Sequence, residues 1–264
     1  MSIADCPPGR FAPTSGEPPV RLNTARPLTV RHLTERLTLA VVSIAWLRKQ
    51  SDATRAGLER RHLSPQEAAY ATALPVRRRR DEWLAGRFAI KHCVTAHQRR
   101  HRGVTAATRE VRVDRLVAGM RSGKPVVDVP VEVGLSHSGD FAVAACGPHA
   151  IGVDVEHRTE LPPLVRELLD GDGDPSSWHS GVRRLASMPE ALRWACREAV
   201  LKHYAVGLRV NVREVVLTRW EPDGRFHWRA GPELLRQAPA DGYRPLTTWA
   251  GRVDGYSLAL VWQY

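Results

Sequence analysis

Apolar and polar residues alternate in several short runs along the chain, a pattern that is typical of half-buried β-strands. The clearest run is IGVDVE at 151–156. Because successive side chains of a strand point to opposite faces, its three apolar residues share one face, and Gly152, Asp154 and Glu156 share the other. The run therefore predicts a strand that buries one face and carries two carboxylates on the opposite face.

Two longer segments have the apolar spacing of helices. One is predicted over 77–97, with Trp83, Leu84, Phe88 and Cys93 facing inward. The other contains WACREAVLK and is expected to end near residue 207. A third, shorter helix is predicted from a start signal: Ser64 is suited to the N-cap, Pro65 to the first helical position and Glu67 to the capping box.

The second long helix places Trp194, Glu198 and Lys202 on one stripe, because residues four positions apart are neighbours on a helix surface. Trp194 is expected to lie in the core. Glu198 follows Asp154 by 44 residues, enough chain for the helix to return to the strand. Three carboxylates near one lysine suggest a cation site, and ligands that are all oxygen suit Mg²⁺ held together with phosphates.

Strands and helices alternate unevenly, which predicts an α+β fold. The Pro- and Gly-rich residues 1–30 are expected to form a loose N-terminal tail, and a break near 146–150 divides the rest into subdomains at 31–148 and 149–264. A loop rich in Gly, Asp and Ser is expected within 161–188. Further strands are predicted at 38–46, 126–133, 141–146, 215–220, 225–229 and 256–262.

Composition narrows the class of protein. The four cysteines form no C-x-x-C pair, which favours a reducing, cytoplasmic setting, and we expect neither a secretory signal nor a membrane span. The net charge of +11 and pI of about 10.2 favour anionic partners. Zinc-finger, RNP and helix-turn-helix patterns are missing, which argues against a nucleic-acid-binding protein. The acidic run at 170–174 does not fit a calcium loop, because its sixth and twelfth positions are Pro175 and Gly181.

Five motifs resemble those of the 4′-phosphopantetheinyl transferases of the surfactin-synthetase-activating type. They are LAGRFAIK at 84–91, GKP at 123–125, SHS at 136–138, GVDVE at 152–156 and WACREAVLK at 194–202. They stand in the family's order. The last motif departs from the family's W-x-x-K-E-x-x-x-K, because Arg197 replaces the lysine before the glutamate and Ala195 replaces a common hydroxyl residue.

The resemblance implies an enzyme that transfers the phosphopantetheine arm of coenzyme A to a serine of an apo carrier protein and releases 3′,5′-ADP. It implies a monomer of two similar subdomains in a pseudo-twofold arrangement, each a small sheet packed with a long helix. Its carrier would belong to fatty acid, polyketide or nonribosomal peptide synthesis, the last two being routes to secondary metabolites.

The resemblance also implies roles for single residues. Asp154, Glu156 and Glu198 would hold Mg²⁺, with Mn²⁺ as the alternative. Glu198 would act as general base on the serine hydroxyl, either directly or through a metal-bound water. Lys202 would neutralise or protonate the leaving phosphate, and Asp154 and Lys202 both belong to the expected coenzyme A site.

The remaining residues of the expected coenzyme A site lie earlier in the chain. Arg87 and Lys124 would bind the 3′-phosphate end, and Lys91 would add to that patch. Ser136 and His137, expected on a turn, would contact a cofactor phosphate. Two alternatives stay open: a non-catalytic homologue, and a basic nucleic-acid-binding protein.

Overall fold

The computed structural model describes residues 18–119, 121–157, 161, 163–169, 185–237 and 246–263. The chain divides into two compact units. The N-terminal unit comprises Val20–Val117 and Ser122–His149, and the C-terminal unit contains Ala150–Tyr264.

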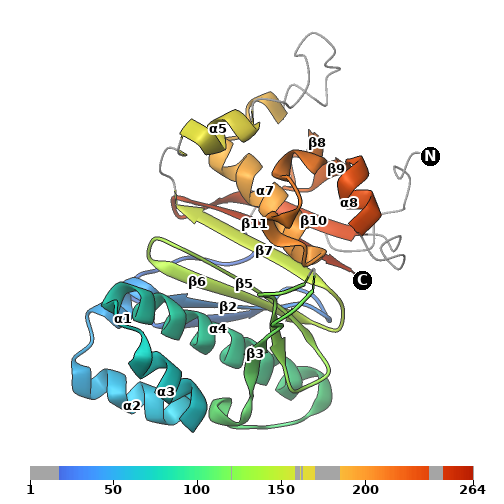
Figure 1. The fold of residues 1–264 in the computed structure, drawn as a ribbon. Helices are drawn as coiled ribbons and strands as arrows, with labels where there is room; N and C mark the ends of the chain where they lie inside the picture. The colour runs from blue at the N-terminus through green and yellow to red at the C-terminus, as the bar shows by residue number, and fades with distance from the viewer. Residues whose placement is uncertain are drawn as a thin grey trace. The chain divides into compact units, whose positions relative to one another are not determined.

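The N-terminal unit is built on a four-stranded antiparallel sheet in the order β1-β2-β6-β5. A long helix, α4, lies along one face of this sheet and packs on its central strands β2 and β6 (Figure 1). The strands are β1 (Leu28–His32), β2 (Thr38–Ser43), β5 (Glu132–Ser138) and β6 (Phe141–Gly147). The core of the unit lies between α4 and the sheet.

Helix α4 (Arg77–Arg102) buries the predicted stripe, since Leu84, Phe88 and Cys93 are at most 6% exposed. Trp83 is only partly buried and packs against the edge of the same core. The helix runs five residues beyond the predicted end. It stops at Gly103, whose φ of 65° is a left-handed conformation that suits glycine and ends a helix.

Smaller elements surround this core. They are α1 (Ile44–Arg48), α2 (Asp52–His62), α3 (Pro65–Ala73), η1 (Thr108–Glu110), β3 (Val113–Arg115) and β4 (Pro125–Val127). The predicted strand 38–46 is too long, because the Ser43 hydroxyl accepts a hydrogen bond from the Trp46 N–H and so starts α1. The predicted strand 126–133 is two strands, β4 and β5.

The predicted helix start at Ser64 is confirmed, and both bonds of its capping box form. The Glu67 N–H donates to Ser64 Oγ at 3.3 Å, and the Ser64 N–H donates to Glu67 Oε2 at 2.9 Å. This local signal was readable because a capping box needs only four consecutive residues.

The C-terminal unit contains a three-stranded antiparallel sheet in the order β10-β11-β7 and a separate β8-β9 hairpin. Its strands are β7 (Ile151–His157), β8 (Val215–Trp220), β9 (Phe226–Ala230), β10 (Leu246–Val253) and β11 (Tyr256–Gln263). Its helices are α5 (Pro163–Leu169), α7 (Glu190–His203), α8 (Pro232–Gln237), η3 (Gly207–Arg209) and η4 (Val212–Glu214). Helix α7 packs on β7 and β11, and the core of the unit lies around it (Figure 1).

The fold is therefore a mixture of helices and small antiparallel sheets, in agreement with the predicted α+β class. Each unit packs one long helix on one face of a sheet. None of the described helices combines the length and apolar character that crossing a bilayer requires. Most of the expected N-terminal tail and of the loop within 161–188, including the acidic run at 170–174, lie outside the described residues.

Helix α7 approaches β7 so closely at Gly152 that no side chain fits between them. A Cβ at this glycine would lie 1.7 Å from the Ala199 carbonyl oxygen and 2.8 Å from the His203 backbone nitrogen. Both neighbours are backbone atoms, so neither can rotate away. The contact requires glycine at this position of the strand.

We expect Gly152→Ala to lower the free energy of unfolding by about 2–3 kcal/mol, because the added methyl forces α7 away from β7. Chemical denaturation checks this. Gly57→Ala, in helix α2, is the matched control: its Cβ meets only Arg60 Nη2 at 3.9 Å. That substitution should raise the free energy of unfolding by about 0.5–1 kcal/mol, since alanine favours a helix. Equal stability of the Gly152 variant and the natural protein would contradict the packing argument.

Candidate functional site

The candidate site of the C-terminal unit lies where the side chains of β7 meet helix α7. Gly152, Asp154 and Glu156 share one face of β7, as the alternation predicted. That face is the one covered by α7, because Gly152 contacts the helix backbone and Asp154 pairs with Lys202. The close approach at Gly152 thus carries Asp154 to the polar side chains of the helix.

The Lys202 ammonium lies between two carboxylates. Its Nζ is paired with Asp154 Oδ1 and lies 3.9 Å from Glu198 Oε2, one helical turn back on α7. The side chain of Asp154 is 2% exposed and that of Glu198 is 12% exposed, whereas Lys202 keeps 30%. The structure therefore brings these three predicted site residues together at the edge of the buried interior.

Burial and charge shift the proton affinities in this cluster. Burial raises the pKa of Glu198; Lys202 opposes that rise and Asp154 adds to it. Burial also disfavours the charged ammonium, but the negative charges of Asp154, Glu198 and Glu156 outweigh it and raise the pKa of Lys202. Lys202 is consequently protonated at neutral pH, and Glu198 is a stronger base than an exposed glutamate.

The cluster has the donor chemistry of a site for a hard cation. Its ligands are carboxylate oxygens, and Glu198 Oε1 is buried and accepts no hydrogen bond from any described residue. Within the described ranges, however, no three His, Cys, Asp or Glu side chains converge as a metal-binding group. The Lys202 ammonium supplies the positive charge between Asp154 and Glu198. The predicted metal set of Asp154, Glu156 and Glu198 stays a prediction.

The two neighbouring departures from the motif lie away from this cluster. Arg197 is 2% exposed, and its Nε–H donates to the Val215 carbonyl oxygen of β8 at 3.0 Å. Ala195 is fully buried, and Trp194 packs against the same core, as expected. The substitution of arginine for lysine at position 197 therefore concerns the contact between α7 and β8.

In the N-terminal unit, Lys124 precedes β4 in the β3-β4 hairpin. Gly123 before it has a φ of 92°, and the Gly123 N–H donates to the Leu116 carbonyl oxygen at 2.8 Å. The Lys124 ammonium pairs with Glu132 of β5, and its side chain is 11% exposed. The hairpin thus holds a cation beside the sheet. The role of Glu132 had no signal in the sequence, because it lies outside the motifs.

Arg87 of α4 is held by an aromatic ring and a carboxylate. Its guanidinium carbon lies 5.0 Å from the centre of the Trp83 ring, and its Nε lies 4.0 Å from Glu67 Oε1. Burial lowers the pKa of Arg87, and Arg115 adds to that effect, while Glu67 opposes it. An arginine remains charged in this setting, so Arg87 is a largely buried cation whose position is fixed by its neighbours.

Lys91 lies in the interior, which argues against its expected contact with coenzyme A. Its side chain is 0% exposed, and Nζ lies 2.7 Å from Glu67 Oε2. The ammonium also donates to the carbonyl oxygens of Val111 at 2.6 Å and Thr108 at 3.3 Å. These acceptors use all three of its N–H groups, so Lys91 acts as an internal cross-link and leaves no donor for a phosphate.

Ser136 and His137 lie in the last part of β5, which corrects the expectation that they form a turn. Ser136 pairs in register with Val143 of β6 and is buried, whereas His137 pairs with Ala142 and is exposed. The turn is at the following residues, where Gly139 has a φ of 56°. The motif suggested a turn because serine is common in turns.

Comparison with known proteins gives limited similarity. No protein-family model matches the chain. Over 90 residues the chain is 23% identical to the 4′-phosphopantetheinyl transferase gsp of Aneurinibacillus migulanus. That alignment covers 34% of this chain and 38% of the relative, so the chain spans well under half the length of the curated protein it matches.

Among solved structures, the chain is similar to a holo-(acyl-carrier-protein) synthase from Bacillus anthracis, crystallised in complex with CoA (3′,5′-ADP). The identity is 22% and the TM-score 0.33, and the match covers 42% of this chain and 92% of the synthase.

We expect Lys91→Met to lower the free energy of unfolding by about 3–5 kcal/mol, because it removes the nearest counter-charge of the buried Glu67 carboxylate and leaves Arg87, 4.0 Å away, as its partner. Thermal and denaturant unfolding would measure the loss. Lys49→Met is the matched control, since Lys49 is exposed, and it should change stability by less than about 0.5 kcal/mol. A small loss for Lys91→Met would mean that the internal cross-link is not stabilising.

We expect Glu198→Gln to be more stable than the natural protein at neutral pH. The raised pKa of Glu198 means that the folded state binds its proton more tightly than the unfolded state. The free energy of unfolding should therefore fall as pH rises from below the ordinary pKa of 4.5 through the raised value. The glutamine variant lacks this slope, so the two proteins should converge in acid and separate at neutral pH. Parallel pH–stability profiles would contradict the raised pKa.

Proposed function

We propose that this protein is a phosphopantetheinyl transferase, which moves the phosphopantetheine arm of coenzyme A to a serine of an apo carrier protein and releases 3′,5′-ADP. The observation that carries the proposal is the convergence of Asp154, Glu198 and Lys202 at one point of α7 and β7. The motif resemblance and the similarity to a curated 4′-phosphopantetheinyl transferase support it.

The carboxylates would hold the divalent cation. Asp154, Glu156 and Glu198 supply only oxygen donors, which suits Mg²⁺ or, as the alternative, Mn²⁺. Bound there, the ion would neutralise charge on the diphosphate. A carboxylate face this crowded needs positive charge, and Lys202 meets that need in the ligand-free protein.

Glu198 and Lys202 have proton affinities that suit opposite tasks. The raised pKa of Glu198 makes it a better base toward the serine hydroxyl, directly or through a water. The raised pKa of Lys202 keeps it protonated, so it can neutralise or protonate the departing phosphate of 3′,5′-ADP. Both residues lie on one face of α7, one turn apart, which lets acid and base act on the same reacting phosphorus.

Arg87, Lys124, Ser136 and His137 are the proposed contacts to the 3′-phosphate and the other phosphates of coenzyme A. Arg87 and Lys124 are positioned cations, and arginine can bind a phosphate through two parallel N–H groups. Lys91 contributes indirectly, because it fixes the Glu67 carboxylate that lies beside Arg87. The 3′-phosphate would compete with Glu132 for Lys124.

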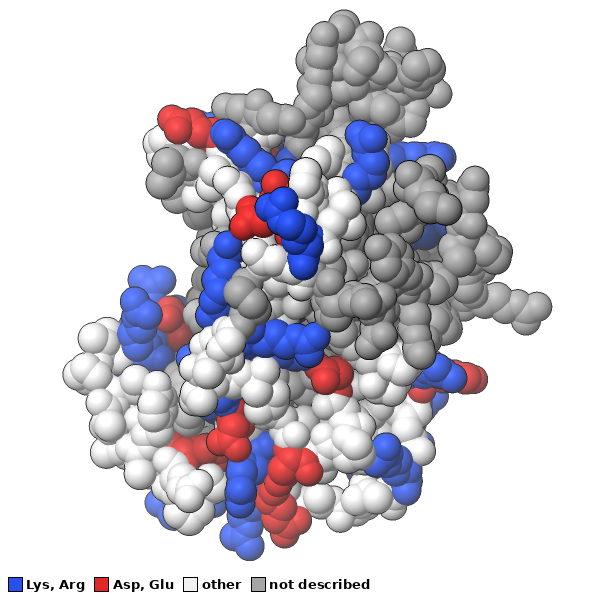
Figure 2. All heavy atoms as spheres, turned by 45° about the vertical axis from the view of Figure 1, so that its right-hand side comes forward, with Lys and Arg blue, Asp and Glu red and all other residues white. Residues whose placement is uncertain are grey.

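The proposal includes a monomer, a pseudo-twofold relation between the units, and an acidic carrier protein as partner. The three cysteines in the described part of the chain are buried thiols, which suits the cytoplasmic location expected from the sequence. Basic and acidic side chains both occur on the face shown in Figure 2. The ion pairs of the described residues include Arg78 with Glu82 and Arg80 with Glu59. Such pairs neutralise part of the basic charge, which supports the transferase over the nucleic-acid alternative.

The direct test incubates the full chain with coenzyme A, Mg²⁺ and a panel of apo carrier proteins, and weighs each carrier by intact mass spectrometry. The proposal expects a gain of one phosphopantetheine on at least one carrier, abolished by EDTA. Coenzyme A binding without any gain would favour a non-catalytic homologue. Salt-dependent DNA binding without coenzyme A binding would favour the nucleic-acid alternative.

We expect Asp154→Asn and Glu198→Gln each to reduce the rate of carrier loading by about a hundredfold or more, because each removes a carboxylate that faces the reacting phosphate and its cation. Initial rates at saturating Mg²⁺ measure this. Glu190 lies on the same helix, pairs with Arg166 and has a side chain that is 43% exposed. Glu190→Gln is therefore the matched control and should keep the natural rate. Near-natural turnover in either variant would mean that the substituted carboxylate takes no part in the reaction.

A further inference from the structure

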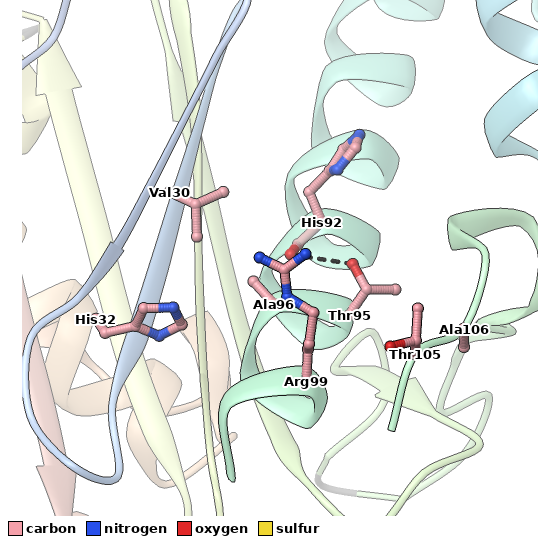
Figure 3. Close-up of a pocket in the computed structure, with 8 residues that line it drawn as sticks. All are labelled: Val30, His32, His92, Thr95, Ala96, Arg99, Thr105 and Ala106. Carbon is pink, nitrogen blue, oxygen red and sulfur yellow. Dashed lines mark hydrogen bonds between the residues drawn. The ribbon is translucent and has the colours of Figure 1, made fainter. Parts of the chain in front are cut away.

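A cavity of about 410 Å³ lies in the N-terminal unit, bounded by β1, the C-terminal half of α4 and the segment that follows this helix. This volume is within the range of small-molecule sites. Figure 3 shows the Arg99 guanidinium between β1, which carries Val30 and His32, and the segment that carries Thr105. None of the residues proposed for transfer lines this cavity. Arg87 lies 12 residues before Arg99 on α4, or about 18 Å along the helix axis.

The lining of this cavity favours an anion. It combines Arg99 with two imidazoles, His32 and His92, and two threonine hydroxyls, Thr95 and Thr105, and no carboxylate is among its lining residues. The remaining walls are small and apolar, formed by one valine and two alanines. The Thr95 hydroxyl already donates to the Lys91 carbonyl oxygen at 2.9 Å, so the donors offered to a ligand are the guanidinium fork, the imidazoles and the Thr105 hydroxyl. This set suits an oxyanion with several acceptor atoms.

Charge at the end of α4 has an ordinary explanation, which covers Arg99 together with its neighbours, because all of them lie in the last turn. Cations in the last turn of a helix are favourable beside its free carbonyl groups, and Arg100 and Arg102 need no other reason. Of the arginines in this turn, only Arg99 lines the cavity. Arg102 is exposed in the same turn outside the cavity and so provides a matched comparison.

We propose that this cavity is a second anion site, which binds a phosphate monoester of about the size of a sugar phosphate, with Arg99 as its anchor. The dianionic phosphate would take the guanidinium and imidazole donors, and the cavity is larger than phosphate alone, so the sugar would lie against Val30 and the alanines. The site does not depend on the proposed transferase function.

Binding in this cavity should be coupled to proton uptake. Burial lowers the pKa of His92 to about 4, and His62 and Arg61 of α2 add to that effect. The pKa of His32 is also lowered, by burial and then by Arg100, His101 and Arg99 of α4. Both imidazoles are therefore neutral near pH 7 in the free protein. A bound dianion favours their protonation, so affinity should rise as pH falls from about 8 to about 6.5; below about 6 the phosphate monoester itself takes up a proton, which opposes the rise.

The test follows the histidine ring signals of the full-length protein by NMR during titration with ribose 5-phosphate, inorganic phosphate and ribose. We expect ribose 5-phosphate to shift the signals of His92 and His32 with saturation, ribose to leave them unchanged, and the affinity to increase as pH falls from about 8 to about 6.5. Absence of saturable shifts with ribose 5-phosphate at low ionic strength would overturn the proposal.

Variants locate the binding. Arg99→Gln should weaken ribose 5-phosphate binding about tenfold or more, because it removes the charge-assisted bonds, while Arg102→Gln keeps the natural affinity. Arg99 is exposed, so its substitution is expected to leave the fold intact, which circular dichroism checks. Equal weakening of ribose 5-phosphate binding in the Arg99 and Arg102 variants would mean that only the net charge matters. That result would overturn the proposed site. If Lys124→Ala abolished ribose 5-phosphate binding while Arg99→Gln kept it, the ligand would belong to the proposed coenzyme A site. That result would overturn the second anion site as well.

Discussion

The close approach of α7 to β7 at Gly152 is the constraint on which the candidate site depends. Because glycine has no Cβ, the backbone of the helix can lie directly on the strand. The next residue on that face, Asp154, is then carried against Glu198 and Lys202. One close contact between two backbones therefore sets the spacing of three ionisable groups. The burial and the neighbouring charges that accompany it shift the proton affinities of the two groups on the helix.

Glu67 has a comparable organising role in the N-terminal unit. Its Oε2 accepts hydrogen bonds from the Ser64 N–H and the Lys91 ammonium, and its Oε1 lies beside Arg87. A residue that caps α3 thus also anchors two side chains of α4. The attraction within a buried ion pair of this kind is largely offset by the cost of removing both charges from water, so the pair stabilises the fold only modestly. Removal of one partner is strongly destabilising, because the other charge stays buried. The position of Arg87 is consequently tied to the start of a different helix.

Local signals in the sequence predicted most of this arrangement. The alternation at 151–156 and the four-residue spacing of Glu198 and Lys202 depend only on backbone periodicity, and the structure confirms the shared faces. The burial of Lys91 could not be predicted, because its acceptors Val111 and Thr108 are backbone groups that lie close only after folding. The end of β2 at Ser43 could not be predicted either, because a serine within an apolar run is compatible with a strand and with a helix cap.

The internal position of Lys91 also bears on composition. The chain uses arginine for nearly all its positive charges and has only four lysines. At Lys91 three acceptors lie within bonding distance of a single nitrogen, which an ammonium with three N–H groups can satisfy and a guanidinium nitrogen, with at most two, cannot. At Lys202 one nitrogen lies between two carboxylates. At these two positions the number and placement of the acceptors therefore favour lysine over arginine. At exposed surface positions either residue would supply the same charge.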